Sequence, residues 1–167
     1  KLPVMLKPHL RPTASRTRET LFNWLHASIA GSLCLDMFAG SGVLGFEAVS
    51  RGARAATLID NDAQVVAQLR QQAARLNTEA ITIMHMNAVQ YLSQTQLQYD
   101  TIFIDPPFHN HDLAQLLEQL IKSPCLKRNT QIYLEAPSGS LPQQLPVGLD
   151  WRRQSQAGAV EYGLLST

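Results

Sequence analysis

Four consecutive residues of this sequence could hold a reacting group. Asp105, Pro106, Pro107 and Phe108 follow an apolar run at residues 101–104. The two prolines fix φ twice and remove two amide donors, which leaves the carbonyl groups of Asp105 and Pro106 as outward-facing acceptors. A planar amine on a nucleobase is a poor nucleophile because its lone pair is delocalised, and acceptors can fix its two hydrogens. Phe108 can stack on the base, so Asp105, Pro106 and Phe108 are predicted to be catalytic residues that orient an amine toward an electrophile.

Residues 33–45 predict a second site, which would bind a ligand. An apolar run ends at Asp36, and the turn that follows contains Gly40, Gly42 and Gly45 in the pattern Gly-x-Gly-x-x-Gly. Gly40 and Gly42 can take positive φ and carry no Cβ, so a ligand could approach the backbone and meet the amides that open the next helix. A nucleotide-like cofactor is the natural occupant. By itself, the glycine pattern also fits an ordinary strand-to-helix turn.

The position of Asp60 supports a nucleotide-like cofactor. Asp60 follows the next apolar run, residues 55–59, and lies 24 residues beyond Asp36. A Rossmann-like unit places an acid at about this separation, where it binds ribose hydroxyls.

Both stretches must be positioned by a parallel sheet. Apolar spacing predicts helices at residues 13–27, 43–50, 63–76 and 112–121, with a short helix or turn near Tyr91. It predicts strands at residues 33–35, 55–59, 81–85, 101–104 and 132–134, and a closing hairpin of 151–155 and 159–165. Strands that alternate with helices form a doubly wound sheet, which binds ligands at the carboxyl ends of its strands. Asp36, Asp60 and Asp105 all lie at such ends.

The positive charge of the chain is concentrated at its beginning. The 167 residues carry a formal net charge of +1, yet the first eighteen contain no acid and five basic residues, namely Lys1, Lys7, Arg11, Arg16 and Arg18. These five residues suit contacts with RNA phosphates, although a solvated tail would have the same composition. Residues 1–12 are rich in proline and predict an extended arm. Because the chain starts without Met, we expect further residues before Lys1.

Length and composition favour a single domain, residues 1–167. An apolar content of 45% is enough for a core, and no run approaches the roughly eighteen apolar residues of a membrane-spanning helix. We therefore expect a soluble cytoplasmic protein. Cys34 and Cys125 fit no disulfide or metal pattern and are interpreted as reduced structural residues. His109 and His111 lack a third spaced ligand, so no metal is expected.

The two chemical stretches together resemble a known class of enzyme. Residues 105–108 resemble motif IV of the amino-methyltransferases, (Asp/Asn/Ser)-Pro-Pro-(Tyr/Phe/Trp), which use S-adenosylmethionine. Asp36-Met-Phe-Ala-Gly-Ser-Gly looks like their motif I, Asp60 like the acid that holds the ribose, and Asn87-Ala88 like the pair that contacts adenine. Asn61 stands where these enzymes often have an apolar residue packed on adenine. The resemblance implies a cofactor site of Asp36, Phe38, Ala39, Gly40, Gly42, Asp60, Asn61, Asn87, Ala88 and Asp105.

Further segments are similar to a narrower family. Lys1-Leu-Pro-Val, Leu10-Arg-Pro-Thr and Arg18-Glu-Thr-Leu-Phe-Asn-Trp-Leu resemble the RsmD family, as do residues 34–42, 105–108 and 158–162. Its members are bacterial methyltransferases that act on guanine N2 in 16S ribosomal RNA. The resemblance implies an α/β, Rossmann-like class I methyltransferase fold, with a seven-stranded mostly parallel sheet, helices on both faces and an antiparallel last strand. We expect a monomer whose partner is 16S rRNA in the small ribosomal subunit or its assembly intermediate.

Other functions stay open from the sequence. An amino-methyltransferase could instead act on adenine N6 or glutamine, because the four-residue motif serves all three amines. A nicotinamide-dependent oxidoreductase would fit the glycine pattern but would leave the double proline without a role. A non-catalytic RNA-binding or ribosome-assembly module would fit the basic arm.

Overall fold

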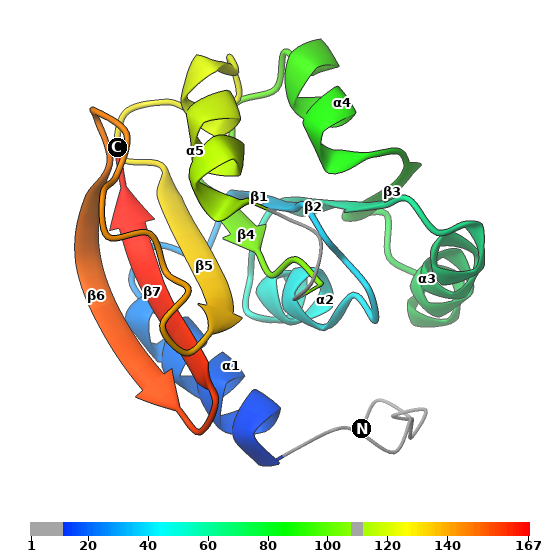
Figure 1. Ribbon diagram of the computed structural model, residues 1–167. Helices are drawn as coiled ribbons and strands as arrows, with labels where there is room; N and C mark the ends of the chain where they lie inside the picture. Colours follow the sequence, from blue (N-terminus) through cyan, green and yellow to red (C-terminus); the bar gives the residue numbers. More distant parts are fainter. Residues whose placement is uncertain (1–11, 108–111) are drawn as a thin grey trace.

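The computed structural model describes residues 12–107 and 112–167, which form one seven-stranded sheet with helices on both faces (Figure 1). Lys1, Lys7, Arg11 and Phe108 therefore lie outside the described residues. The strands are β1 (Leu33–Asp36), β2 (Ala55–Asp60), β3 (Ile81–His85), β4 (Thr101–Ile104), β5 (Gln131–Pro137), β6 (Asp150–Ala157) and β7 (Val160–Ser166). The helices are α1 (Pro12–Trp24), α2 (Val43–Ser50), α3 (Ala63–Leu76), α4 (Ala88–Gln94) and α5 (Leu113–Lys122).

The sheet is parallel except at one edge. Its strand order is β3-β2-β1-β4-β5-β7-β6. The first five strands in that order run parallel, whereas β7 is antiparallel both to β5 and to β6. The expected Rossmann-like fold with an antiparallel last strand is therefore confirmed.

Two apolar layers hold the helices against the sheet. Side chains of α1, α2 and α3 pack on one face, and side chains of α4 and α5 pack on the other. Because both faces are covered, the central strands are apolar on both sides: all four residues of β4 are buried. Successive strand residues alternate between the two layers, so that Phe103 belongs to the first and Ile102 and Ile104 to the second.

The expected elements are present, and the largest shifts in their ends are at the first helix and at β5. The first helix ends at Trp24 rather than at residue 27, and the chain continues through turns that still bury Leu25 and Ile29. Strand β5 runs to Pro137 rather than to residue 134, because it pairs with β7 along its whole length. Local apolar spacing predicts neither end, since both depend on contacts with distant segments.

The structure also describes both cysteines and allows a search for membrane-spanning helices. Cys34 and Cys125 are buried and unpaired. Within residues 12–107 and 112–167, no helix combines the length and apolar character needed to cross a bilayer.

The β6–β7 hairpin predicts a sensitive position at Gly163. A Cβ there would lie 2.7 Å from the Arg153 carbonyl oxygen and would also meet the Trp151 ring, and the backbone oxygen cannot move aside without separating the strands. Gly163→Ala should therefore lower the free energy of unfolding by about 2 kcal/mol. Urea unfolding measures this change, with Gln154→Ala at the paired exposed position as control. A Gly163→Ala variant as stable as this control would contradict the packing argument.

Candidate active site

Four carboxyl groups lie at the carboxyl ends of neighbouring parallel strands. Asp36 ends β1, Asp60 ends β2, Asp105 follows β4, and Glu135 lies near the end of β5. Each stands two positions after a residue of the core layer shared with α1, α2 and α3, namely Cys34, Leu58, Phe103 and Tyr133 respectively. Strand alternation therefore places all four carboxyl groups on the same side of the sheet.

Burial raises the pKa values of three of these groups, and repulsion by neighbouring acids adds to the rise for Asp36 and Asp105. Burial raises the pKa of Asp36 to about 7, and the charge of Asp60 adds to the increase. Burial also raises the pKa of Asp105 to about 8, with further contributions from the charges of Glu135 and Asp36. The pKa of Glu135 is raised by burial as well, although a hydrogen bond from the Tyr133 hydroxyl opposes this.

No positive group balances these carboxyl groups in the described part of the chain. The ion pairs found there are Arg51–Glu47, Lys122–Glu118 and Lys127–Asp100, none of which involves the four. Asp36 is 2% exposed, and its Oδ1 accepts no hydrogen bond from any described residue. A buried carboxylate oxygen without a hydrogen bond is costly. The site therefore suits a ligand that brings positive charge and hydrogen-bond donors.

The charge of the site discriminates between two cofactors. S-adenosylmethionine carries a sulfonium and an ammonium group, both of which a row of carboxylates would attract. A nicotinamide dinucleotide carries a pyrophosphate, which the same row would repel. Asp36 with its unpartnered oxygen thus fits S-adenosylmethionine, and the electrostatics disfavour the oxidoreductase interpretation.

The three glycines in and after the loop that follows β1 lack a side chain for different structural reasons. Gly40 has a φ of +49°, and a Cβ on it would meet nothing within 4 Å, so this position is open toward a ligand. A Cβ on Gly42 would lie 2.5 Å from Leu69 on α3, and one on Gly45 would lie 2.5 Å from Leu58 on β2. We expected the missing side chain of Gly42 to admit a ligand, and this prediction is wrong because the core fills that space. Gly42 still has a φ of +75°, which favours glycine.

Asp60 links the glycine loop to the end of β2. Its Oδ2 accepts a hydrogen bond from the Gly40 amide at 3.0 Å, and its Oδ1 accepts one from the Asp62 amide at 2.9 Å. The amide of Ala39 donates to the Ile59 carbonyl at 2.8 Å in the same region. These bonds place the acid beside the open glycine, as the Rossmann-like spacing predicts.

The residues expected at the adenine lie at the ends of β2 and β3. Asn61 is exposed, and its carbonyl oxygen lies 3.2 Å from Nε2 of His85. The Asn87 side chain caps α4 by accepting from the amides of Val89 and Gln90, so its oxygen already has a structural role. Ala88 is buried, and Phe38 is half-buried.

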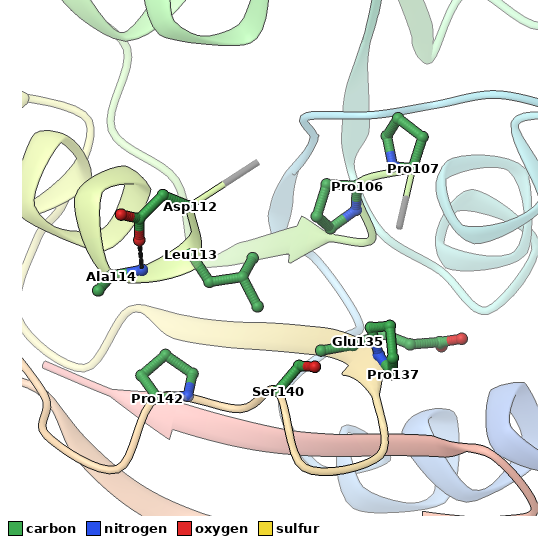
Figure 2. Close-up of a pocket in the computed structure, with 10 residues that line it drawn as sticks. Pro106, Pro107, Asp112, Leu113, Ala114, Glu135, Pro137, Ser140 and Pro142 are labelled. Carbon is green, nitrogen blue, oxygen red and sulfur yellow. Dashed lines mark hydrogen bonds between the residues drawn. The ribbon is translucent and has the colours of Figure 1, made fainter. Parts of the chain in front are cut away.

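A cavity of about 310 Å³ lies beside the double proline (Figure 2). Pro106 is buried and Pro107 is exposed at its edge. The other walls come from the start of α5, the end of β5 and the following loop; the lining residues are Asp112, Leu113, Ala114, Glu135, Ala136, Pro137, Ser140 and Pro142. Its volume is at the small end of the range for ligand pockets.

Glu135 was not predicted from the sequence as a site residue. It is an acid near the carboxyl end of a parallel strand, as Asp36, Asp60 and Asp105 are, and that shared position was an available signal. The short expected strand at 132–134 left Glu135 outside the sheet, so its alignment with Asp105 could not be seen.

The two described arginines of the basic segment lie on α1. Arg16 is exposed and Arg18 is half-buried, and neither forms an ion pair with another described residue. Within the same two ranges, no three His, Cys, Asp or Glu side chains are grouped so that they could hold a metal ion.

Asp36→Asn is expected to stabilise the protein without cofactor. Because folding raises the pKa of this carboxyl, its ionisation destabilises the fold increasingly as the pH rises from about 4 to about 7. The variant should therefore raise the free energy of unfolding by about 2 kcal/mol or more at pH 8 and by less at pH 5. It should also weaken S-adenosylmethionine binding, because the carboxylate is lost.

Urea unfolding at the two pH values and calorimetric titration with the cofactor test this trade-off. Asp62→Asn is the matched control, since asparagine caps a helix as well as aspartate does. An equal change in stability at pH 5 and pH 8 would contradict the role of ionisation.

Comparisons with known proteins identify the family of this chain. The chain matches a family described as conserved hypothetical protein 95 over residues 1–166. It is 40% identical over 164 residues to ribosomal RNA small subunit methyltransferase D of Escherichia coli K12, a match that covers 98% of this chain and 83% of the relative. The protein of the same name from Haemophilus influenzae is 39% identical over 168 residues, which cover 98% of this chain and 86% of the relative.

A solved structure supports the same assignment. A protein of Escherichia coli, described as a methyltransferase, has a TM-score of 0.86 and 39% identity, covering 95% of this chain and 88% of that one. The expected methyltransferase fold and S-adenosylmethionine as the cofactor of this class are confirmed. Because these matches cover nearly the whole sequence, the chain belongs to the RsmD family of methyltransferases.

Proposed function

We propose that this protein transfers a methyl group from S-adenosylmethionine to the exocyclic N2 of a guanine in 16S rRNA of the small ribosomal subunit. The observation that supports it most is the row of carboxyl groups that includes the Asp105-Pro106-Pro107 turn and forms no ion pair with a described residue. The names of the relatives support ribosomal RNA as the substrate. The guanine N2 assignment rests on the family resemblance.

The cofactor would lie across the ends of β1, β2 and β3. Asp36 would provide the negative charge, the backbone of residues 38–42 would contact the methionine part, and Asp60 would accept from the ribose hydroxyls. Asn61, Asn87 and Ala88 would border the adenine. When bound, S-adenosylmethionine supplies a methyl group on a positively charged sulfur, which a nitrogen can attack.

Asp105 would act on the amine that receives the methyl group. Its carboxylate and the Pro106 carbonyl would accept the two hydrogens of the amine and hold the nitrogen in line with the methyl group. The nitrogen must lose one proton when it gains the methyl group, and the ionised Asp105 carboxylate is a suitable acceptor for it. Phe108 would stack on the base.

Access to a guanine requires an unpaired or flipped nucleotide. We propose that the basic residues Lys1, Lys7, Arg11, Arg16 and Arg18 contact RNA phosphates around it. Such contacts would make binding sensitive to salt.

Labelled methyl transfer to small ribosomal subunits tests the proposed function. The subunits come from a methylation-deficient strain, naked 16S rRNA is assayed alongside, and the nucleosides are separated afterwards. Label in N2-methylguanosine is the expected result. Label in N6-methyladenosine or in protein glutamine would show that the substrate is an amine other than guanine N2. Binding to subunits and to cofactor without any label would favour a non-catalytic module.

Asp105→Ala should abolish methyl transfer while S-adenosylmethionine affinity stays within a few-fold of wild type. The carboxylate orients the amine, and loss of orientation is expected to lower the rate at least about 1,000-fold. Single-turnover transfer and calorimetric titration measure the two quantities separately. A parallel loss of rate and cofactor affinity would show that Asp105 mainly binds the cofactor.

Methyl transfer should also become faster as the pH rises. Burial and neighbouring charges raise the pKa of Asp105 to about 8, so its accepting, ionised form is a minority at neutral pH in the free protein. The value of kcat/KM should therefore increase from pH 6 and level off above about pH 8. A profile measured at constant ionic strength checks this, and a flat profile would contradict the raised pKa.

A further inference from the structure

We propose that Glu135 reads the guanine by accepting the N1 hydrogen of the base beside Asp105, and so determines which amine is methylated. This inference rests on the proposed function and concerns its specificity. It assigns a role to a residue that the sequence motifs do not include.

Glu135 stands next to Asp105 in the sheet. Strands β4 and β5 are parallel, with Ile104 paired to Leu134, so the following residues of the two strands lie side by side. The two carboxyl groups are close enough for the charge of Glu135 to raise the pKa of Asp105. Glu135 also lines the cavity that Pro106 and Pro107 border. In Figure 2 its side chain extends away from Leu113 on α5.

One oxygen of Glu135 is held and the other is available. Oε2 accepts a hydrogen bond of 2.6 Å from the Tyr133 hydroxyl, two residues earlier on the same strand. No described residue donates a hydrogen bond to Oε1. Tyr133 is 1% exposed and packs with Tyr162, so its hydroxyl is a fixed donor. A carboxylate held on one side, with a free acceptor on the other, is preorganised for a ligand donor.

The pair of carboxyl groups matches guanine better than the other two amines. Guanine presents N1–H and the N2 amine side by side, which gives donors for both Glu135 and Asp105. Adenine has an unprotonated N1 beside its N6 amine, and glutamine has a carbonyl oxygen beside its amide nitrogen. Either acceptor would face the Glu135 carboxylate and be repelled. A site that leaves buried polar groups unpaired with the wrong ligand discriminates strongly.

The ionisation of Glu135 depends on the groups around it. Those that face it are Tyr133 on its own strand, Asp105 after β4 and Tyr162 opposite it on β7. Among these, the Tyr133 hydroxyl donates to the carboxylate and favours its ionised form. Reading guanine N1–H needs an ionised Glu135, the form that the hydrogen bond from Tyr133 favours.

The test compares Glu135→Gln with wild type on small ribosomal subunits from a methylation-deficient strain. The amide cannot offer the same charged acceptor, so we expect kcat/KM for the subunit to fall about 30-fold or more. The loss should persist at pH 9, where Asp105 is ionised in both proteins. Cofactor affinity and the thermal unfolding midpoint should stay close to wild type. Glu161→Gln is the matched control, a carboxylate on β7 outside the cavity, and should retain wild-type activity.

A second variant keeps the proposal testable if Glu135→Gln does not fold. Tyr133→Phe retains the buried ring and removes only the donor to Glu135. The pKa of Glu135 should then rise, which moves the acidic limb of the pH–rate profile to higher pH. Glu135→Gln should move the same limb to lower pH, because it removes a charge that raises the pKa of Asp105. The two variants should therefore shift the acidic limb in opposite directions. This is expected only if both carboxyl groups must be ionised for the same step with the substrate.

Three outcomes would overturn the proposal. If Glu135→Gln has wild-type or higher kcat/KM at neutral pH and loses nothing at pH 9, Glu135 only adjusts the pKa of Asp105. A parallel loss of cofactor affinity or stability would mean a structural role. Label from the wild-type protein in a nucleoside other than N2-methylguanosine would overturn the proposed function itself, and this result is read from the wild type alone.

Discussion

The candidate site depends on carboxyl groups that the sheet withdraws from water and holds close together at one edge. Asp36 is nearly inaccessible and keeps an oxygen without a hydrogen-bond partner among the described residues. Asp105 and Glu135 stand side by side on neighbouring strands. Such an arrangement is unfavourable in the free protein, and it persists because the sheet and its two apolar layers fix the strands. Binding of a cation relieves the repulsion, so the same feature that destabilises the fold provides affinity.

The sheet geometry explains why these groups meet. Parallel strands bring all their carboxyl ends to one edge, and alternation decides which face each side chain occupies. Cys34, Leu58, Phe103 and Tyr133 pack into the layer beneath α1, α2 and α3, so the acids two positions later share that face. Strand β7 then pairs antiparallel with β5 and extends it as far as Pro137. That extension places Glu135 in register beside the Asp105 turn.

The loop after β1 shows that a sequence pattern can combine two physical requirements. Gly42 and Gly45 leave room for Leu69 and Leu58, so their missing side chains serve the packing of α2 on α3 and β2. Gly40 faces open space, and its amide donates to Asp60. Substitution at the first glycine would act on the ligand side of the loop, whereas substitution at the others would act on the core.

The sequence alone determined the order of helices and strands, because apolar spacing and capping residues are local. Asp62, Asn87 and Asp112 each cap the helix that follows them. The sequence also determined that Asp36, Asp60 and Asp105 lie at strand ends, and the motifs around them identified the family. Only the tertiary structure decided that one oxygen of Asp36 has no hydrogen-bond partner among the described residues, that Gly42 faces the core, and that Glu135 joins Asp105. These three facts depend on strand register and on side chains from distant segments, which no local pattern encodes.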